Sequence, residues 1–215
     1  MDKTFKKLPG QRQEEILYAA AGIFAENGYW RANINSICDR AGISNGALYR
    51  YFKNKETLFI YVFNHAVERM LGVYNLGECG GKDLFEQIRR MLRNTVEYYR
   101  DYPAYFELYA DIWSGSMNEM AAKVNLDQEK IIDNFWINLA EAGAAQGEID
   151  SAISPRYAAY LIDSQTLLFF FAMTSAYHQK RLNIFLVENS EQFPYEELID
   201  KIVENLKLCL APRSL

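Results

Sequence analysis

The sequence has few of the features that mark specialised classes of protein. Its 215 residues include only five prolines and twelve glycines, which argues against fibrous or low-complexity architecture. The three cysteines, Cys38, Cys79 and Cys209, are far apart and form no CxxC pair, so no disulfide framework is predicted. The first fifteen residues lack the apolar stretch of a secretory signal. These absences together predict a protein of the reducing cytoplasm.

Membrane spans and catalytic motifs are missing too. The most apolar stretch, residues 157–177, carries Asp163 and Gln165 near its middle, which argues against a membrane partner. The two histidines, His65 and His178, lie far apart, and no HExxH, GxSxG, Walker A or GxGxxG string occurs. We therefore expect no enzyme, no metal site and no cofactor. An all-helical enzyme that uses an aromatic cluster as its active site is kept as an alternative.

What the sequence does have is an uneven distribution of charge. The net charge is −5, yet residues 1–55 hold nine basic and five acidic side chains, a net charge of +4. The remaining residues hold 14 basic and 23 acidic side chains, a net charge of −9. A cationic head on an acidic body is expected when a polyanion-binding module is joined to another domain. Chance variation over a short window would give the same asymmetry.

Hydrophobic residues recur at helical spacing along the whole chain, and no alternating strand pattern appears. The pattern predicts an all-α fold of about nine helices. Their approximate ranges are 11–27, 34–41, 45–52, 54–74, 84–100, 105–113, 117–145, 155–177 and 195–210. A break near residue 125 is left open for the helix at 117–145. The glycine-rich stretch 76–83 is the clearest break between head and body. Ser154 and Pro155 form a good N-cap pair for one helix, and Cys209 is assigned to the apolar side of the last.

Two short helices near the N-terminus fit a helix-turn-helix. They are joined by residues 41–44, where Gly42 supplies the positive φ that a tight turn needs. The small core predicted between them consists of Ile37, Ala41, Ile43, Leu48 and Phe52. The other side of the second helix would face the major groove of DNA. A generic three-helix bundle whose basic residues only keep it soluble also fits this spacing.

The outward residues of the second helix suit DNA. Asn45 can pair with adenine through two hydrogen bonds, Arg50 can reach guanine or a phosphate, and Ala47 can contact a thymine methyl. Gly46 permits close approach, and Lys55 opens the next helix, where free N–H groups and an ammonium can hold a phosphate. The basic arm 3–7 is a further phosphate contact. The predicted DNA-binding residues are Asn33, Ser44, Asn45, Gly46, Ala47, Tyr49, Arg50 and Lys55.

Motif matches in residues 12–58 carry a family resemblance. The first set comprises Arg12, Ile16, Leu17, Ala19, Ala20, Phe24, Gly28 and Tyr29. The second, ICDRAGISNGALYRYFKNKETL at 37–58, contains Ala-Gly-Ile-Ser, Gly-x-Leu-Tyr, Tyr-Phe and Lys-x-x-Leu in register. This segment resembles the N-terminal domain of the Tet repressor (TetR) family of bacterial transcription regulators. Ala32 and Asn33 depart from the family's usual hydroxyl pair, and Cys38 replaces its usual alanine as a packing residue.

The resemblance implies a function and a division of the chain. Residues 1–55 would be the helix-turn-helix DNA-binding domain, and residues 56–215 a helical domain for effector binding and dimerisation. The implied protein is a ligand-responsive regulator, with repression favoured, that binds a palindromic operator as a homodimer. The last two predicted helices would pair with a second copy. A small hydrophobic or aromatic effector would release the DNA.

An aromatic concentration marks the candidate effector site. Seven of the sixteen residues in 98–113 are aromatic, and aromatic walls with a few hydroxyls suit an apolar ligand. The predicted ligand-binding residues are Tyr99, Tyr102, Phe106, Tyr109, Trp113, Phe135, Trp136, Asp163 and Phe170. A plain aromatic core explains the same concentration, and Asp163 fits a subunit contact equally well. Glu14 and Glu15 are interpreted as a solvated face, and His65 as a boundary residue.

Two other classes of function stay open from the sequence. A helical small-molecule-binding protein or enzyme without a DNA role would bind a ligand but show no preference for a duplex. A regulator controlled by a partner protein would have a filled, dry core in place of the effector site.

Overall fold

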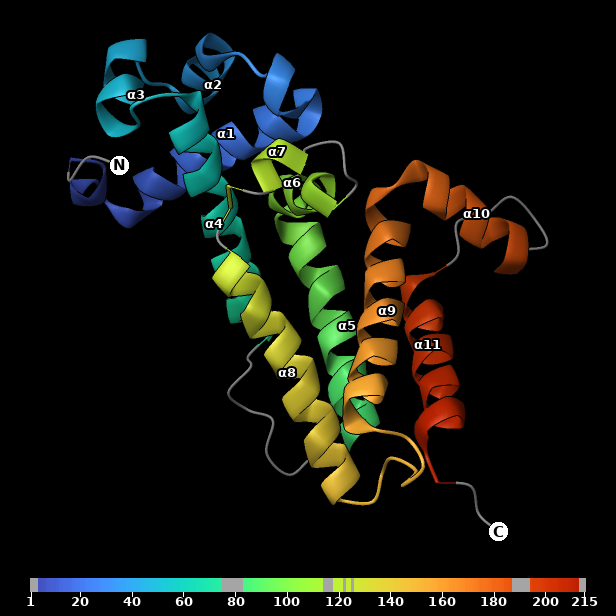
Figure 1. Ribbon diagram of the computed structural model, residues 1–215. Coiled ribbons are helices and arrows are strands. Elements are labelled where there is room, and N and C mark those ends of the chain that lie inside the picture. The colour runs from blue at the N-terminus through green and yellow to red at the C-terminus, as the bar shows by residue number, and fades with distance from the viewer. Residues whose placement is uncertain are drawn as a thin grey trace. The chain divides into compact units, whose positions relative to one another are not determined.

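The computed structural model of the chain is helical throughout the residues that it describes, which are 4–74, 83–113, 118–121, 123–124, 126–186 and 194–212 (Figure 1). A short 3-10 helix, η1 (Phe5–Lys7), precedes the α-helices. These are α1 (Gly10–Arg31), α2 (Ile34–Ala41), α3 (Asn45–Tyr51), α4 (Lys55–Tyr74), α5 (Leu84–Asp101), α6 (Pro103–Trp113), α7 (Asn118–Ala121), α8 (Leu126–Ala145), α9 (Pro155–Thr174), α10 (Ala176–Leu186) and α11 (Tyr195–Leu210). The predicted all-α class is confirmed.

Contacts between backbone segments divide the chain into two compact units. The first unit comprises Met1–Arg69 and Asp101–Asn125, and the second comprises Met70–Arg100 and Leu126–Leu215. The first unit therefore includes α6 and α7 as well as the N-terminal helices. This division concerns compactness alone, and the predicted functional boundary between residues 55 and 56 stays a prediction.

Local signals set the ends of the short helices in the first unit. Gly28 interrupts α1 with a φ of 68°, near the predicted end of that helix. The Asn33 side chain accepts a hydrogen bond from the Asn35 backbone N–H at 2.8 Å and so caps α2. Gly42 ends α2 with a φ of 62°, and Ser44 caps α3 by accepting from the Ala47 N–H at 3.2 Å. The predicted turn between the two helices is confirmed.

A compact apolar core holds the helix-turn-helix together. Ile37, Ala41, Leu48 and Phe52 are buried as predicted, whereas Ile43 is only half-buried. Additional buried residues come from the flanking segments: Phe5, Ile16, Leu17, Ala20, Phe24, Cys38, Leu58 and Phe59. Burial raises the pKa of the Cys38 thiol, which fits a packing role.

In the second unit, α9 packs against α8, α10 and α11. The helix begins as the sequence predicts, with Pro155 in its first turn and the Ser154 hydroxyl accepting from the Tyr157 N–H at 3.3 Å. Its buried side is apolar and comprises Ala158, Ala159, Ile162, Phe169, Phe170, Ala172 and Met173. Figure 1 shows α5, α8, α9 and α11 running alongside one another in this unit.

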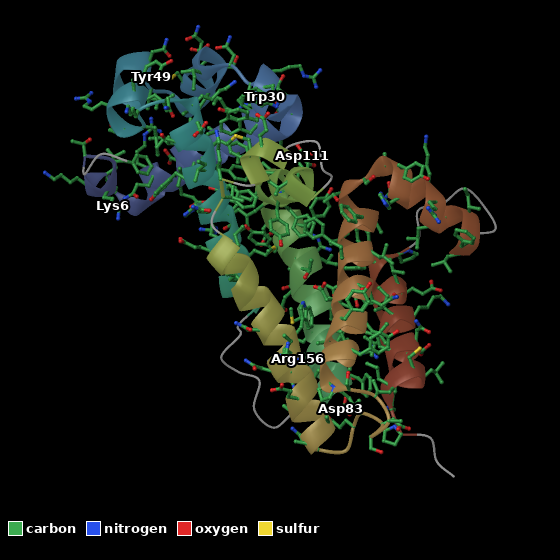
Figure 2. All side chains as sticks on the ribbon, viewed as in Figure 1. Lys6, Trp30, Tyr49, Asp83, Asp111 and Arg156 are labelled. Atoms are coloured by element: carbon green, nitrogen blue, oxygen red, sulfur yellow. The ribbon has the colours of Figure 1, made fainter. Side chains whose placement is uncertain are left out.

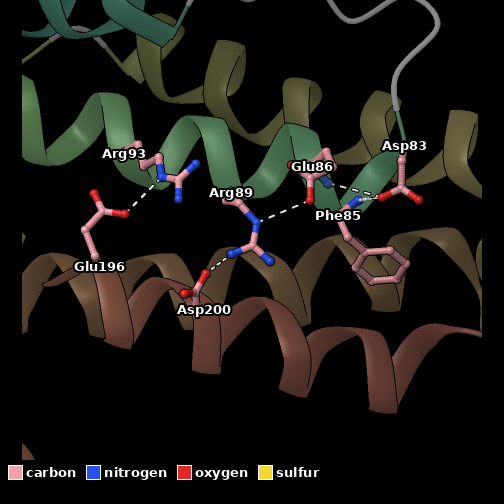
Figure 3. Close-up of polar contacts among 7 residues, drawn as sticks. All are labelled: Asp83, Phe85, Glu86, Arg89, Arg93, Glu196 and Asp200. Atoms are coloured by element: carbon pink, nitrogen blue, oxygen red, sulfur yellow. Dashed lines mark hydrogen bonds and ion pairs between the residues drawn. The ribbon is translucent and has the colours of Figure 1, made fainter.

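Ion pairs join α5 to α11 on the surface of the second unit (Figure 3). Arg89 pairs with Asp200, and the Nε atom of Arg93 lies 3.0 Å from a carboxylate oxygen of Glu196. Exposed pairs of this kind contribute only about 0–1 kcal/mol. These pairs therefore add little to the stability of the second unit.

The structure corrects several predicted features of the C-terminal half. The helix predicted at 155–177 ends at Thr174, and α10 follows it where no helix was expected. None of the α10 residues is buried, and its large apolar side chains, which include Tyr177, Ile184 and Phe185, are exposed, so this helix has no core-facing stripe. Cys209 is exposed, because the buried side of α11 is formed by other residues.

Three further points concern boundaries. The helix predicted at 117–145 is divided into α7 and α8, and α8 begins at Leu126, next to the break that the sequence left open near residue 125. The predicted connector at 76–83 lies outside the described residues, except for Asp83. Among the helices described, none has both the length and the hydropathy that crossing a membrane requires.

Candidate nucleic-acid interface

Helix α3 presents to solvent most of the side chains that the sequence assigned to DNA. Leu48 is its buried residue, and its C-cap Phe52 is also buried. The opposite side is exposed or half-buried, and it comprises Asn45, Gly46, Ala47, Tyr49 and Arg50. Tyr49 projects from α3 with 52% of its surface exposed (Figure 2). The first unit therefore carries a short helix whose outer side holds amide, phenol and guanidinium groups.

Three asparagines connect the start of α2 to the start of α3. Asn33 holds the backbone N–H of Asn35, as described above. The Asn35 side-chain carbonyl in turn accepts a hydrogen bond from the Nδ2 atom of Asn45 at 2.7 Å. Sequence reasoning selected Asn33 and Asn45 but missed Asn35. Its exposed position in the first turn of α2 gave no hydrophobic or motif signal.

Lys55 is engaged with the protein's own backbone. Its ammonium donates hydrogen bonds to the carbonyls of Trp30 at 3.2 Å and Ala32 at 3.1 Å. The Nζ atom also lies 4.8 Å from the centre of the Tyr29 ring, within the range of a cation–π contact. An ammonium has three donors, and two are used here. Lys55 therefore fastens the end of α1 to the start of α4, and its phosphate contact stays a prediction.

The remaining basic groups of the first unit differ in how far they are paired. Arg12 donates to the carbonyls of Ala41 and Gly42 at 2.9 and 3.0 Å, at the end of α2. Arg40 forms two hydrogen bonds with the Glu26 carboxylate, at 2.7 and 2.8 Å. The other basic side chains of this region are exposed, and they include Lys6, Lys7, Arg31, Arg50 and Lys53.

A half-buried polar cluster joins α1, α4 and α6 within the first unit. The Glu14 carboxylate lies 2.8 Å from the Nε2 atom of His65 and 3.3 Å from a guanidinium nitrogen of Arg69. Its other oxygen accepts a hydrogen bond from the Tyr105 hydroxyl at 3.0 Å. The Arg69 guanidinium also lies 4.3 Å from the centre of the Tyr102 ring. The interpretation of Glu14 as a solvated residue is therefore wrong.

The electrostatics of this cluster favour an ionised carboxylate. Burial alone raises the pKa of Glu14, but the hydrogen bonds from His65 and Tyr105 and the positive charge of Arg69 outweigh it. The pKa of Glu14 is therefore lowered overall. His65, interpreted from the sequence as a boundary residue, is half-buried and contributes to this site.

The predicted ligand-binding residues are distributed over both compact units. Tyr102, Phe106 and Tyr109 belong to the first, where Phe106 is fully buried and Tyr109 stacks on Phe63 with ring centres 6.0 Å apart. The second unit holds five of the others: Tyr99, Phe135, Trp136, Asp163 and Phe170. Phe135, Trp136 and Phe170 are buried, whereas Tyr99 and Asp163 are half-buried. The Trp113 side chain lies outside the described residues.

Two hollows in the described structure are lined by other residues. One, of about 570 Å³, is half-open and lies in the first unit among α1, α2 and α6, with Arg12, Tyr18 and Arg40 in its wall. The other, of about 380 Å³, lies in the second unit near Gly147 and Pro155. Among the described residues that line them, none is a predicted ligand contact.

An exposed, capped helix-turn-helix in a first unit whose described residues are helical is typical of DNA-binding regulators, and comparison with known proteins points to the same class. Residues 16–62 match the sequence model of a family described as bacterial regulatory proteins, tetR family. The resemblance to the TetR family noted in the sequence is thereby confirmed for this N-terminal segment.

Individual relatives agree with this assignment. The transcriptional repressor KstR2 of Mycolicibacterium smegmatis is 25% identical over 143 residues, which cover 65% of this chain and 68% of that protein. The fatty acid metabolism regulator protein of Bacillus subtilis is 40% identical over 60 residues, which cover 26% of this chain and only 31% of that protein. These relatives are regulators, which supports the expectation that the chain is not an enzyme.

A solved structure shares the whole fold. The transcriptional regulator FadR from Bacillus subtilis, determined in complex with stearoyl-CoA, superposes with a TM-score of 0.66 at 22% identity. The match covers 90% of this chain and 96% of that one. At this identity the likeness establishes the fold of the chain and leaves its ligand open.

The Glu14 cluster generates a prediction about stability and pH. Glu14→Gln should lower the free energy of unfolding by about 1–2 kcal/mol at pH 7, because the ionised carboxylate accepts charge-assisted hydrogen bonds. A lowered pKa stabilises the fold fully above the ordinary value of 4.5, and this contribution is lost as pH falls through the lowered value. Urea unfolding at several pH values should show the difference between wild type and variant shrinking below about pH 4.5.

The matched control for this experiment is Glu15→Gln, which removes the neighbouring exposed carboxylate. Its ion pair with Arg12 is solvent-exposed, so the change should cost less than about 0.5 kcal/mol. A loss at Glu14 that stays constant from pH 7 to pH 3.5 would contradict the prediction.

Proposed function

We propose that the protein is a ligand-responsive transcriptional repressor that binds a palindromic operator as a homodimer. The observation that carries the proposal is the outer side of α3, a capped, exposed helix in a segment that matches the TetR family. In this proposal Asn45, Ala47, Tyr49 and Arg50 contact base edges or the adjacent backbone. Gly46 lets the backbone approach the duplex closely, and Asn33 and Ser44 cap the two helices that form this surface.

Backbone contacts fix the position of the helix on the duplex. The exposed Lys6 and Lys7 and the unused donor of Lys55 supply phosphate contacts in this proposal. Such contacts orient a protein on DNA but carry no sequence information themselves. Discrimination between operators therefore depends on the few side chains at the outer side of α3.

A second copy of the chain is the proposed partner of α9 and α11. Helix α9 leaves large side chains exposed at helical spacing, at Tyr157, Tyr160 and Leu168. Leu208 on the adjacent α11 is 79% exposed. Large apolar side chains on two neighbouring helices suit a two-fold interface in which the same surface of each protomer takes part. A dimer would present two copies of α3 to successive major grooves.

A hydrophobic effector is the proposed signal. The relatives named above include a regulator of fatty acid metabolism and a regulator solved in complex with stearoyl-CoA. That metabolic role and that ligand belong to those proteins, and they suggest which class of effector to test first. In this chain, α6 carries predicted ligand contacts such as Phe106 and Tyr109, and Tyr102 directly precedes it. The same helix is tied to α1 and α4 through the Tyr105–Glu14 hydrogen bond. A ligand that shifts α6 would therefore act on helices that carry the DNA-binding surface.

The DNA-binding proposal is tested with Arg50→Ala. An operator is first selected from random duplexes, and its affinity is then measured by fluorescence anisotropy. Loss of the exposed Arg50 guanidinium should weaken binding by about tenfold to hundredfold, the range expected when a base or phosphate contact is lost. Arg181→Ala, which removes an equally exposed arginine from α10, should leave affinity unchanged. Wild-type protein that prefers no duplex would instead favour a carrier or enzyme without a DNA role.

The effector proposal is tested with stearoyl-CoA as the first probe. It should weaken operator binding by about 5- to 150-fold, the usual range of coupling between two sites. Free coenzyme A lacks the acyl chain and serves as the control, which should leave affinity unchanged. If stearoyl-CoA, a free fatty acid and a steroid acid all fail to change operator affinity, the hydrophobic effector is wrong.

The dimer proposal is tested with Tyr160→Glu. A carboxylate at this exposed position of α9 would be buried in the proposed interface, at a cost of several kcal/mol per subunit. Analytical ultracentrifugation should show a dimer for wild type and a monomer for the variant. Tyr49→Glu makes the same change at an exposed tyrosine on α3 and should leave the protein dimeric. A monomeric wild type would rule out this part of the proposal.

A further inference from the structure

The hydrogen bond between Asn45 and Asn35 bears on how α3 would read a base. Asn45 is the first residue of α3 and is exposed, so its side chain would otherwise rotate freely in solvent. Its Nδ2 atom donates to the Asn35 side-chain carbonyl at 2.7 Å. The contact comes from a different helix, ten residues away in sequence.

Asn35 is itself well fixed. Its backbone belongs to the first turn of α2, and its N–H is held by the Asn33 side chain at 2.8 Å. Helix α2 is anchored in turn by the buried Ile37, Cys38 and Ala41. The Asn35 side chain is thus attached to a fixed backbone, and its amide oxygen accepts the hydrogen bond that orients the Asn45 side chain.

The contact leaves the reading groups of Asn45 available. A side-chain amide has two N–H donors and one carbonyl acceptor, and the bond to Asn35 uses one donor. The remaining N–H and the carbonyl form the donor–acceptor pair that adenine matches in the major groove with N7 and its amino group. Orientation by Asn35 therefore lowers the entropy lost on binding without using up either group.

We propose that Asn35 is a positioning residue that directs Asn45 at one base pair. It would set discrimination at a position that it does not itself touch. This inference rests on the proposed function, because it requires α3 to read DNA. It goes beyond that proposal by assigning sequence specificity to a residue of α2.

The experiment measures discrimination at each operator position for a set of variants. The Asn45→Ala variant first identifies the base pair that Asn45 reads. In this variant, changing that base pair should no longer weaken binding. Asn35→Ala should reduce discrimination at the same base pair by about tenfold and leave the other positions unchanged. In the Asn45→Ala background, Asn35→Ala should have no further effect on discrimination, because a positioning residue acts only through its partner.

A conservative variant and a control separate positioning from other roles. Asn35→Asp keeps an oxygen acceptor for Asn45, so discrimination at that base pair should be restored. Its added negative charge should weaken binding to all sequences by a similar factor, because it repels the phosphate backbone. Ser36→Ala changes the neighbouring exposed residue of α2 and should leave discrimination as in wild type. Thermal melting checks that each variant is folded.

The outcomes distinguish this inference from the proposed function. If wild type selects an operator but Asn35→Ala keeps full discrimination, the positioning role is wrong while the proposed function stands. Additive effects of Asn35→Ala and Asn45→Ala would show that Asn35 contacts DNA directly, which also overturns the inference. The inference is also overturned if Asn45→Ala changes discrimination at no position of the operator. Wild-type protein without any duplex preference would contradict the proposed function itself.

Discussion

The position of α3 depends on how its ends are held. A helix of seven residues is far too short to be stable alone, and within it Leu48 is the buried residue. The helix is therefore held in place from outside, because its own hydrogen bonds cannot stabilise it. The contacts that hold it are the Ser44 cap, the left-handed turn at Gly42 and the buried Phe52. Because this anchoring uses the inner side and the ends, most of the outer side of α3 stays exposed to solvent. The rest of the first unit supports that arrangement.

The junction of α1, α4 and α6 shows how a polar contact can link parts of one unit. Glu14 receives hydrogen bonds from residues on two other helices, so its carboxylate is satisfied although half-buried. A directional contact of this kind has fewer alternative geometries than an apolar one. Movement of α6 would therefore strain or break the contact with Tyr105, and its effect would reach α1, which packs on α6. This gives the proposed signal a physical route within the first unit.

Features set by neighbouring residues could be predicted from the sequence, and features set by distant residues could not. The caps at Asn33 and Ser44 and the turn at Gly42 are local, so residue type and spacing were sufficient. The Glu14 cluster was missed because its partners lie 51 and 91 residues away. Helix α10 was missed because it buries none of its side chains. The predicted DNA contacts were selected by motif, which could not show that Asn35 joins Asn45.

The internal pairing of Arg12, Arg40 and Lys55 changes what the cationic head offers to a polyanion. Of nine basic groups in residues 1–55, these three and Arg31, whose Nε atom donates to the Asn27 carbonyl at 3.1 Å, are bonded to carbonyls or a carboxylate of the same unit. Counterion release on binding scales with the phosphates that a protein neutralises, about 0.9 ions for each. Arg40, whose charge is balanced by Glu26, would add little to this attraction in the proposed regulator. Arg12 and Lys55 keep their charge, because their partners are neutral carbonyls, but their positions are fixed by the protein before any DNA binds.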